Sequence, residues 1–281
     1  MSFNSRIRRP IARPLSSWPS RVAFTLLLTI SGLAGCGSNP PNPPPEGVWT
    51  NWQIQAGTAI TSTLNTYPSF FGALWIQGTQ SEAFFSAVPS NATDGIDYAG
   101  AFNSSTQEIT LGPLTTLYST GFGFDFAWPA TPYTVTPVTV EVYPPRCLES
   151  QCTATSSSSA VGVEIAPLNG TYTGTLTAST QSDSGQATLT LTQYTLPNSD
   201  GSFSLNGTLT FPAGSGFGAH QVGGVIRGEG INIVGLNPDP FLDFSGTAST
   251  NPAGTQITVS NLSFPVTASN VVTFTGTLTR Q

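Results

Sequence analysis

The chain has no lysine, one histidine, one methionine and three cysteines, and only 8% of its 281 residues are charged. With so few cations, all of them arginine, it lacks the basic surface that nucleic-acid binding needs. It also lacks the Ala-, Leu-, Glu- and Lys-rich composition of long exposed helices, which excludes a helical bundle and a coiled coil. One histidine and three cysteines supply few ligands for a zinc site. We therefore expect neither nucleic acid nor a cofactor as a partner.

The residues that are abundant indicate a folded β protein. There are 29 glycines and 23 prolines, 38% of the chain is hydrophobic and 10% is aromatic. This content is too apolar for a wholly disordered chain, and 281 residues suffice for one or two cores. The predicted fold class is all-β and antiparallel.

The N-terminal segment has the composition of a secretory signal peptide. Its first 21 residues contain five arginines and no acidic residue, and an apolar run follows from Val22 to about Ala34. That run is shorter than the ~20 residues with which a helix crosses a bilayer. A basic stretch followed by a short apolar stretch is typical of signal peptides. We expect residues 1–35 to be removed after export.

The end of this segment, Leu33-Ala34-Gly35-Cys36, resembles the lipobox of bacterial lipoproteins. The resemblance implies cleavage before Cys36 and attachment of diacylglycerol to its thiol, so that this cysteine carries palmitate-type acyl chains. Gly37 stands where an aspartate often marks inner-membrane retention in that family, so the resemblance favours the outer membrane. Two or three acyl chains suffice for a stable anchor, so the membrane is a predicted partner through Cys36.

Cleavage would leave three arginines against 14 acidic residues, a formal charge of −11. Such a surface repels phosphates and anionic headgroups, so the lipid alone must hold the protein at the membrane. Residues 36–46 comprise Cys36 and a proline-rich stretch that favours polyproline II, which predicts a semi-rigid stalk. The expected location is the cell envelope.

The two remaining cysteines, Cys147 and Cys152, have four residues between them and lie in a Pro- and Ser-rich stretch. An even pair in an oxidising compartment usually forms a disulfide. A metal or redox pair is the alternative, but it favours two intervening residues and further ligands nearby. We expect a disulfide that staples this loop.

Residues 168–281 alternate between apolar side chains and Thr or Ser with a period of two, which indicates half-buried strands with one wet face. Asn198-Ser199-Asp200-Gly201 predicts a hairpin turn, and a change of parity near Asn261 predicts a bulge. We count about eight strands here and a similar number in 47–167. Both two barrel- or sandwich-like domains and one bilobed sandwich fit this count. A membrane-spanning barrel also has alternating strands, but the Thr-rich face argues against it.

Residues 47–167 form the aromatic-rich half. The stretch from Phe122 to Trp128 places four aromatic rings on one strand face, which favours a core stripe over an exposed platform. Gly47-Val48-Trp49 is similar to the Gly-X-Trp that opens the first strand of lipocalins, and Gly170-Thr171-Tyr172 with Arg280 loosely repeats it. The similarity covers a few residues and implies no function.

Catalytic residues are scarce. His220 is the only histidine, lies in a Gly-rich stretch and has no Gly-X-Ser-X-Gly partner motif. Two aspartate pairs, Asp94 with Asp97 and Asp239 with Asp243, could serve glycoside hydrolysis, but both lie in turn-like contexts where Asp bonds to the local backbone. We therefore expect no enzyme.

The sequence predicts a lipid-anchored binding or structural module of the envelope. Its ligand would be a carbohydrate or a small apolar molecule, bound by tryptophans of the aromatic-rich half. The candidate ligand-binding residues are Trp49, Trp52, Trp75 and Trp128. The rival hypothesis is an envelope polysaccharide-binding protein or glycoside hydrolase that uses an Asp/Glu pair.

Overall fold

A computed structural model describes residues 43–61, 66–88, 96–113, 121–144, 153–179, 185–213, 215–236, 242–250, 253–267 and 270–281. These residues form sixteen β-strands, and none of them belongs to a helix. In this part of the chain there is accordingly no helix long and apolar enough to cross a membrane. The all-β prediction is confirmed.

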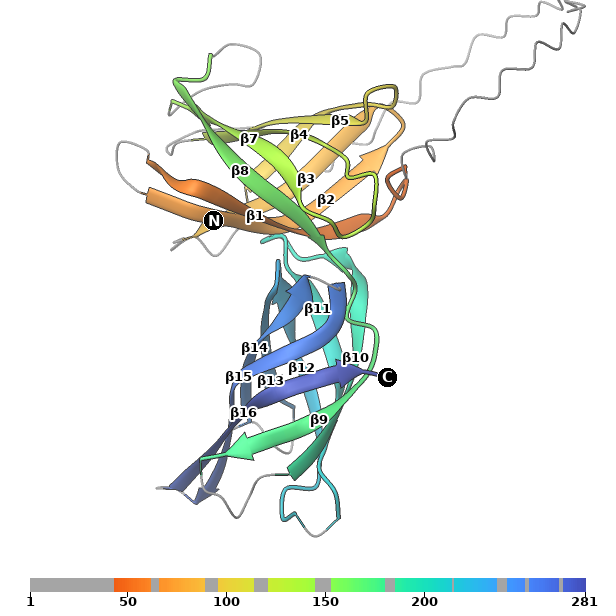
Figure 1. Cartoon of the computed structure of the whole chain (residues 1–281), viewed down its shortest axis with the longest axis vertical. Coiled ribbons are helices and arrows are strands. Elements are labelled where there is room, and N and C mark those ends of the chain that lie inside the picture. Colours follow the sequence, from red (N-terminus) through yellow and green to blue (C-terminus); the bar gives the residue numbers. More distant parts are fainter. Residues whose placement is uncertain are drawn as a thin grey trace, which may run out of the picture. The chain divides into compact units, whose positions relative to one another are not determined.

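The first eight strands form a closed barrel in which each strand pairs with the next and β1 pairs antiparallel with β8 (Figure 1). The strands are β1 (Trp49–Thr61), β2 (Thr66–Gln77), β3 (Gln80–Val88), β4 (Ile96–Asn103), β5 (Glu108–Pro113), β6 (Gly121–Ala127), β7 (Thr136–Tyr143) and β8 (Ser156–Ile165). Closure leaves no unpaired edge strand in this barrel.

The last eight strands form a second closed barrel of the same order, which β9 and β16 close by antiparallel pairing. The strands are β9 (Gly170–Ala178), β10 (Gly185–Pro197), β11 (Phe203–Thr210), β12 (Ala219–Arg227), β13 (Gly230–Gly235), β14 (Asp243–Thr250), β15 (Ala253–Thr267) and β16 (Asn270–Arg280). The structure therefore decides between the two architectures that the sequence left open, in favour of two barrels.

Alternation along the strands fills both barrel interiors with apolar side chains, as expected for eight strands. In β6 and just after it, the side chains of Phe122, Phe124, Phe126 and Trp128 are all buried, so the predicted core stripe is confirmed. In the second barrel the threonines of β10 face solvent while Leu189 is buried.

The predicted turn and bulge are also confirmed. The turn between β10 and β11 holds Gly201 at φ 75°, and its N–H donates to the Asn198 carbonyl at 3.0 Å. A positive φ suits glycine because it has no Cβ. In β15 the register with β16 shifts between Val259 and Leu262, around the predicted position.

Gly170, Tyr172 and Arg280 meet where the second barrel closes. Arg280 of β16 is the register partner of Tyr172 of β9, and its guanidinium donates a hydrogen bond to the Asn169 carbonyl. The same guanidinium lies beside Gly170, where a Cβ would come 3.1 Å from Arg280 Nε. The arginine thus connects β16, the last strand of this barrel, to the start of β9, its first strand.

Hydrogen bonds also link residues of the two barrels. The buried Asn51 of β1 donates to the Gly228 carbonyl at 2.8 Å and accepts from the Gly228 N–H at 2.9 Å. Ser86 of β3 donates to the Asp200 carbonyl at 3.2 Å. The side chain of Asp200 in turn pairs with Arg227. These contacts satisfy buried polar groups that would otherwise carry a desolvation cost.

Several predictions concern residues outside the described part of the chain. These include the signal peptide and most of the stalk, with Cys36. Both cysteines of the predicted disulfide, Cys147 and Cys152, also lie outside it, as do Asp94 and Asp239. These assignments stay predictions.

The seam that closes the second barrel offers a test of the fold. A methyl group at Gly174 of β9 would overlap the Thr277 carbonyl oxygen, whereas one at Gly185 of β10 would meet no atom within 4 Å. We expect Gly174→Ala to lower the free energy of unfolding by about 1–3 kcal/mol, because the seam cannot open without losing hydrogen bonds. Gly185→Ala should be neutral or slightly stabilising. Urea unfolding of the two variants checks this, and equal stabilities would contradict it.

Candidate functional site

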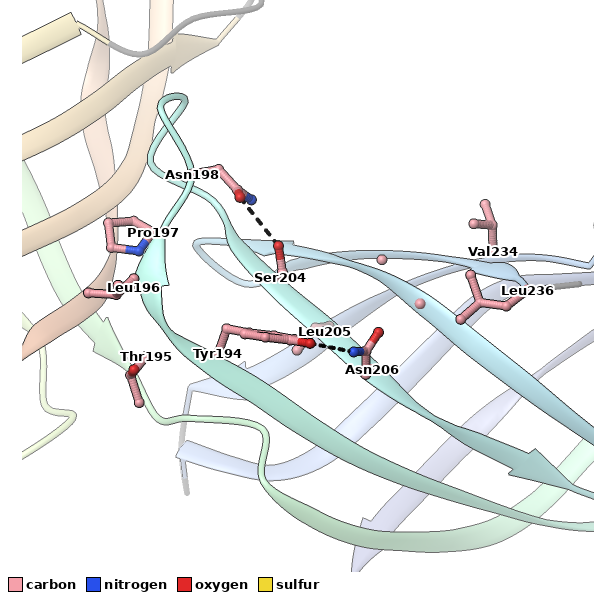
Figure 2. A pocket seen from close by; sticks show the side chains of 12 residues that line it. Tyr194, Thr195, Leu196, Pro197, Asn198, Ser204, Leu205, Asn206, Val234 and Leu236 are labelled. Carbon is pink, nitrogen blue, oxygen red and sulfur yellow. Dashed lines mark hydrogen bonds between the residues drawn. The ribbon is translucent and has the colours of Figure 1, made fainter.

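The outer face of the second barrel carries a groove of about 700 Å³ across β10, β11, β12 and β13, which we call the β10–β13 groove. Figure 2 shows Tyr194 and Asn206 on one side of it, and Val234 and Leu236 on the other. Its lining residues are Tyr194, Thr195, Leu196, Pro197, Asn198, Ser204, Leu205, Asn206, Gly223, Gly224, Val234 and Leu236.

Gly223 accounts for the depression in this face. A Cβ at this position would lie 3.2 Å from Leu236 Cδ2 and 3.3 Å from Asn206 Oδ1. The two side chains therefore stand close to the space above the glycine backbone. A side chain here would occupy part of the groove.

On β10 the groove begins where apolar side chains replace the threonines of a hydroxyl-rich face. Tyr194 is 52% exposed and Leu196 70%, although their positions continue the wet face of Thr190 and Thr192 on β10. Val234 and Leu236 are 49% and 42% exposed. These are four of the eight large exposed hydrophobic residues in the described part of the chain. Single exposed apolar residues are ordinary, but four of them along one groove make it the candidate binding surface.

Hydrogen bonds fix the polar side chains of the groove. Asn206 donates from Nδ2 to the Tyr194 hydroxyl at 2.7 Å, so the phenol ring is held toward β11 (Figure 2). Ser204 donates from its hydroxyl to Asn198 Oδ1 at 3.3 Å. A side chain held in place before binding loses less conformational entropy when a ligand arrives.

The β10–β13 groove has no charged lining residue. Its twelve residues include no Asp, Glu, His, Lys or Arg. It offers an aromatic ring, aliphatic side chains, amides and hydroxyls, which suit packing and hydrogen bonding to an uncharged ligand. General acid–base catalysis by carboxylates has no side chain to use here.

The four tryptophans that the sequence singled out are not gathered in one site. Trp52 and Trp128 lie in the core of the first barrel, 0% and 4% exposed, with their rings 5.4 Å apart. Trp49 and Trp75 are half-buried on the outer face, 6.3 Å apart, and Trp49 stacks on Phe84 at 5.1 Å. Neither core ring is available to a ligand at the surface. Binding by Trp49 and Trp75 stays a prediction.

Of the candidate catalytic side chains, the structure describes those of Asp243 and His220. Asp243 is exposed at the start of β14, while the side chain of Asp97 lies outside the described part. His220 is half-buried, hydrogen-bonds the Phe217 carbonyl and packs its ring against Phe264 at 5.0 Å. These contacts place His220 beside aromatic side chains of the second barrel.

Three carboxylates not singled out from the sequence influence one another on the outer face of the first barrel. Burial raises the pKa of Asp125, a hydrogen bond from Thr110 opposes this, and the charges of Glu141 and Glu108 raise it further. Glu141 accepts a hydrogen bond from the Tyr143 hydroxyl at 2.6 Å, beside a depression of about 500 Å³. Only strand register brings these residues together, because they come from β5, β6 and β7.

Glu164 is a buried carboxyl group within the first barrel. It lies opposite Trp52 in the pairing of β8 with β1, on the inward face, and is 7% exposed. Burial raises its pKa to about 7, because the charged form loses its hydration.

The sequence carries a local signal for the groove. Tyr194 and Leu196 occupy the parity that threonine holds earlier in β10, and Val234 follows Asn232 on the wet parity of β13. Apolar residues at outward-facing positions break the alternation and mark the part of a sheet face that differs from the rest. That these residues line one groove depends on strand pairing, which local periodicity does not determine.

Comparisons of the chain with models of protein families, with curated proteins and with solved structures found no match. The site is therefore interpreted from its own chemistry.

The buried carboxyl group predicts a pH dependence of stability. Between about pH 4.5 and pH 7, Glu164 is neutral in the folded state and ionised in the unfolded state, so the free energy of unfolding falls as the pH rises through this window. We expect Glu164→Gln to be more stable than the original protein above pH 7 by up to about 3 kcal/mol, and equally stable near pH 4. Urea unfolding across this range measures the difference.

The matched control is Glu229→Gln, which removes an exposed carboxylate from the turn between β12 and β13. Because its side chain is exposed, this variant removes a carboxylate without removing a buried one. If Glu164→Gln instead destabilises the protein equally at every pH, the carboxylate has a stabilising partner and the prediction is wrong.

Proposed function

We propose that this protein is a lipid-anchored envelope protein that binds an uncharged ligand, without catalysis, in the β10–β13 groove. The observation that carries the proposal is the cluster of exposed Tyr194, Leu196, Val234 and Leu236 around a glycine floor. Such a cluster costs free energy in water unless something covers it, and its lining provides contacts without reactive groups.

The proposed anchor rests on the sequence. The Leu33-Ala34-Gly35-Cys36 motif follows a basic and then an apolar segment, and proline-rich residues separate it from β1. A strongly acidic chain has no basic patch with which to hold a membrane, so acyl chains at Cys36 would supply the attachment. The barrels would then stand outside the cytoplasm, at the outer membrane.

A glycoside hydrolase is the second candidate, and Asp125 with Glu141 is the carboxylate pair that favours it. Burial raises the pKa of Asp125, as a general acid requires, and a depression adjoins Glu141. Hydrolysis of an envelope polysaccharide that Asp125→Asn and Glu141→Gln abolish would support this candidate.

Labelling with palmitate tests the anchor. We expect the original protein, expressed in a bacterium that processes lipoproteins, to incorporate label, and Cys36→Ser to incorporate none, because the thiol is the predicted acceptor. The double variant Cys147→Ser/Cys152→Ser serves as the control and should keep its label. Undiminished label in Cys36→Ser would refute the assignment.

Binding of the uncharged dye Nile red tests the groove. Gly223→Val would put a side chain into the floor, and we expect it to reduce the affinity for the dye about tenfold or more. Val234→Ser should weaken binding severalfold through lost apolar contact. The matched control is Val271→Ser on β16, where the valine is 54% exposed but lies outside the groove. Equal effects of the two serine variants would contradict the proposal.

A further inference from the structure

The groove is open along its length, which restricts the ligands that can gain binding free energy in it. Its apolar side chains are 42–70% exposed, so a bound molecule keeps its outer side in water. An acyl chain in such a groove would bury only part of its apolar surface and gain only part of the transfer free energy. A ligand with one apolar face and polar edges can bury its whole apolar face while its polar edges stay in water.

The chemistry of the lining matches a sugar ring. The C–H groups of a pyranose form an apolar face that can pack on an aromatic ring, while its hydroxyls point sideways. Tyr194 offers the ring, and the amides of Asn198 and Asn206 and the hydroxyl of Ser204 lie around it. Because no lining residue is charged, the groove has no cation to pair with a uronic acid or a phosphorylated sugar.

The extent of the groove indicates more than one sugar unit. It crosses four adjacent strands, which spans about 14 Å at the usual spacing of ~4.8 Å between strands. Gly223 keeps the middle of this span free of side chains. Val234 and Leu236 on the far side supply a second apolar contact beyond the tyrosine.

We propose that the β10–β13 groove binds an uncharged oligosaccharide, with Tyr194 as its stacking platform and Asn206 as the residue that positions the tyrosine ring. This inference rests on the proposed function and names the ligand class of the same site. Asn206 acts through the 2.7 Å hydrogen bond to the Tyr194 hydroxyl, which holds the ring in one orientation before the ligand arrives.

The experiment uses a panel of neutral and acidic oligosaccharides on an array, followed by titration calorimetry with the best ligand. We expect the purified protein to retain neutral members of the panel only. Tyr194→Ala should weaken binding about tenfold or more because the stacking surface is lost. Val271→Ser on β16 is the control and should bind as the original protein does.

A double-mutant cycle tests the positioning role. Tyr194→Phe keeps the ring and loses the hydroxyl, and Asn206→Ala loses the donor, so each should weaken binding by a similar factor of about two to five. If both act through one hydrogen bond, the double variant should bind no more weakly than either single variant. Additive losses would overturn the positioning role, because Asn206 would then contact the ligand independently.

Displacement of Nile red separates this inference from the proposed function. If the dye binds the groove and Gly223→Val abolishes that binding, but no oligosaccharide is retained or displaces the dye, the sugar class is wrong and the binding groove stands. If neither the dye nor any oligosaccharide binds, both are overturned. Thermal unfolding of each variant shows that a loss of binding does not come from a loss of fold.

Discussion

Closure of each sheet on itself is the constraint on which the rest of the structure depends. A β-sheet with free edges exposes unpaired N–H and C=O groups, and pairing of β1 with β8 and of β9 with β16 removes those edges in both barrels. At the second seam the backbones approach closely at Gly174, where a Cβ would meet the Thr277 carbonyl oxygen of β16. Arg280 completes the second seam by its bond to the Asn169 carbonyl.

A closed eight-stranded barrel has an interior that side chains can fill, and this decides where a ligand can bind. The inward faces carry Trp52, Phe124, Tyr172 and Phe274, all fully or almost fully buried. Recognition is therefore expected on the outside, where most outward positions of the second barrel carry Thr or Ser. Tyr194 and its apolar neighbours gain their significance from that background, because they stand where the fold itself requires no apolar residue.

Two buried polar side chains, Asn51 and Glu164, differ in the consequence of their burial. Asn51 is almost fully buried, yet both ends of its amide are bonded to Gly228, so its burial is compensated. Glu164 is buried on the inward face of β8, and its environment holds the pKa near neutrality. The Asn51 side chain links residues distant in sequence. The Glu164 side chain is predicted to make stability depend on pH.

The sequence alone determined the secondary structure, because the period of two, the Asn198–Gly201 turn and the parity change near Asn261 are local properties of the chain. It also indicated the burial of the aromatic stripe of β6, because large aromatic side chains are buried more often than exposed. Only the tertiary structure decided that the strands close as two barrels, that Trp52 lies in the core while Trp49 is half-buried, and that Tyr194 stands across a glycine floor from Leu236. The physical reason is that strand register and closure join residues far apart in the chain, and periodicity fixes which face a side chain takes but not which neighbour it meets.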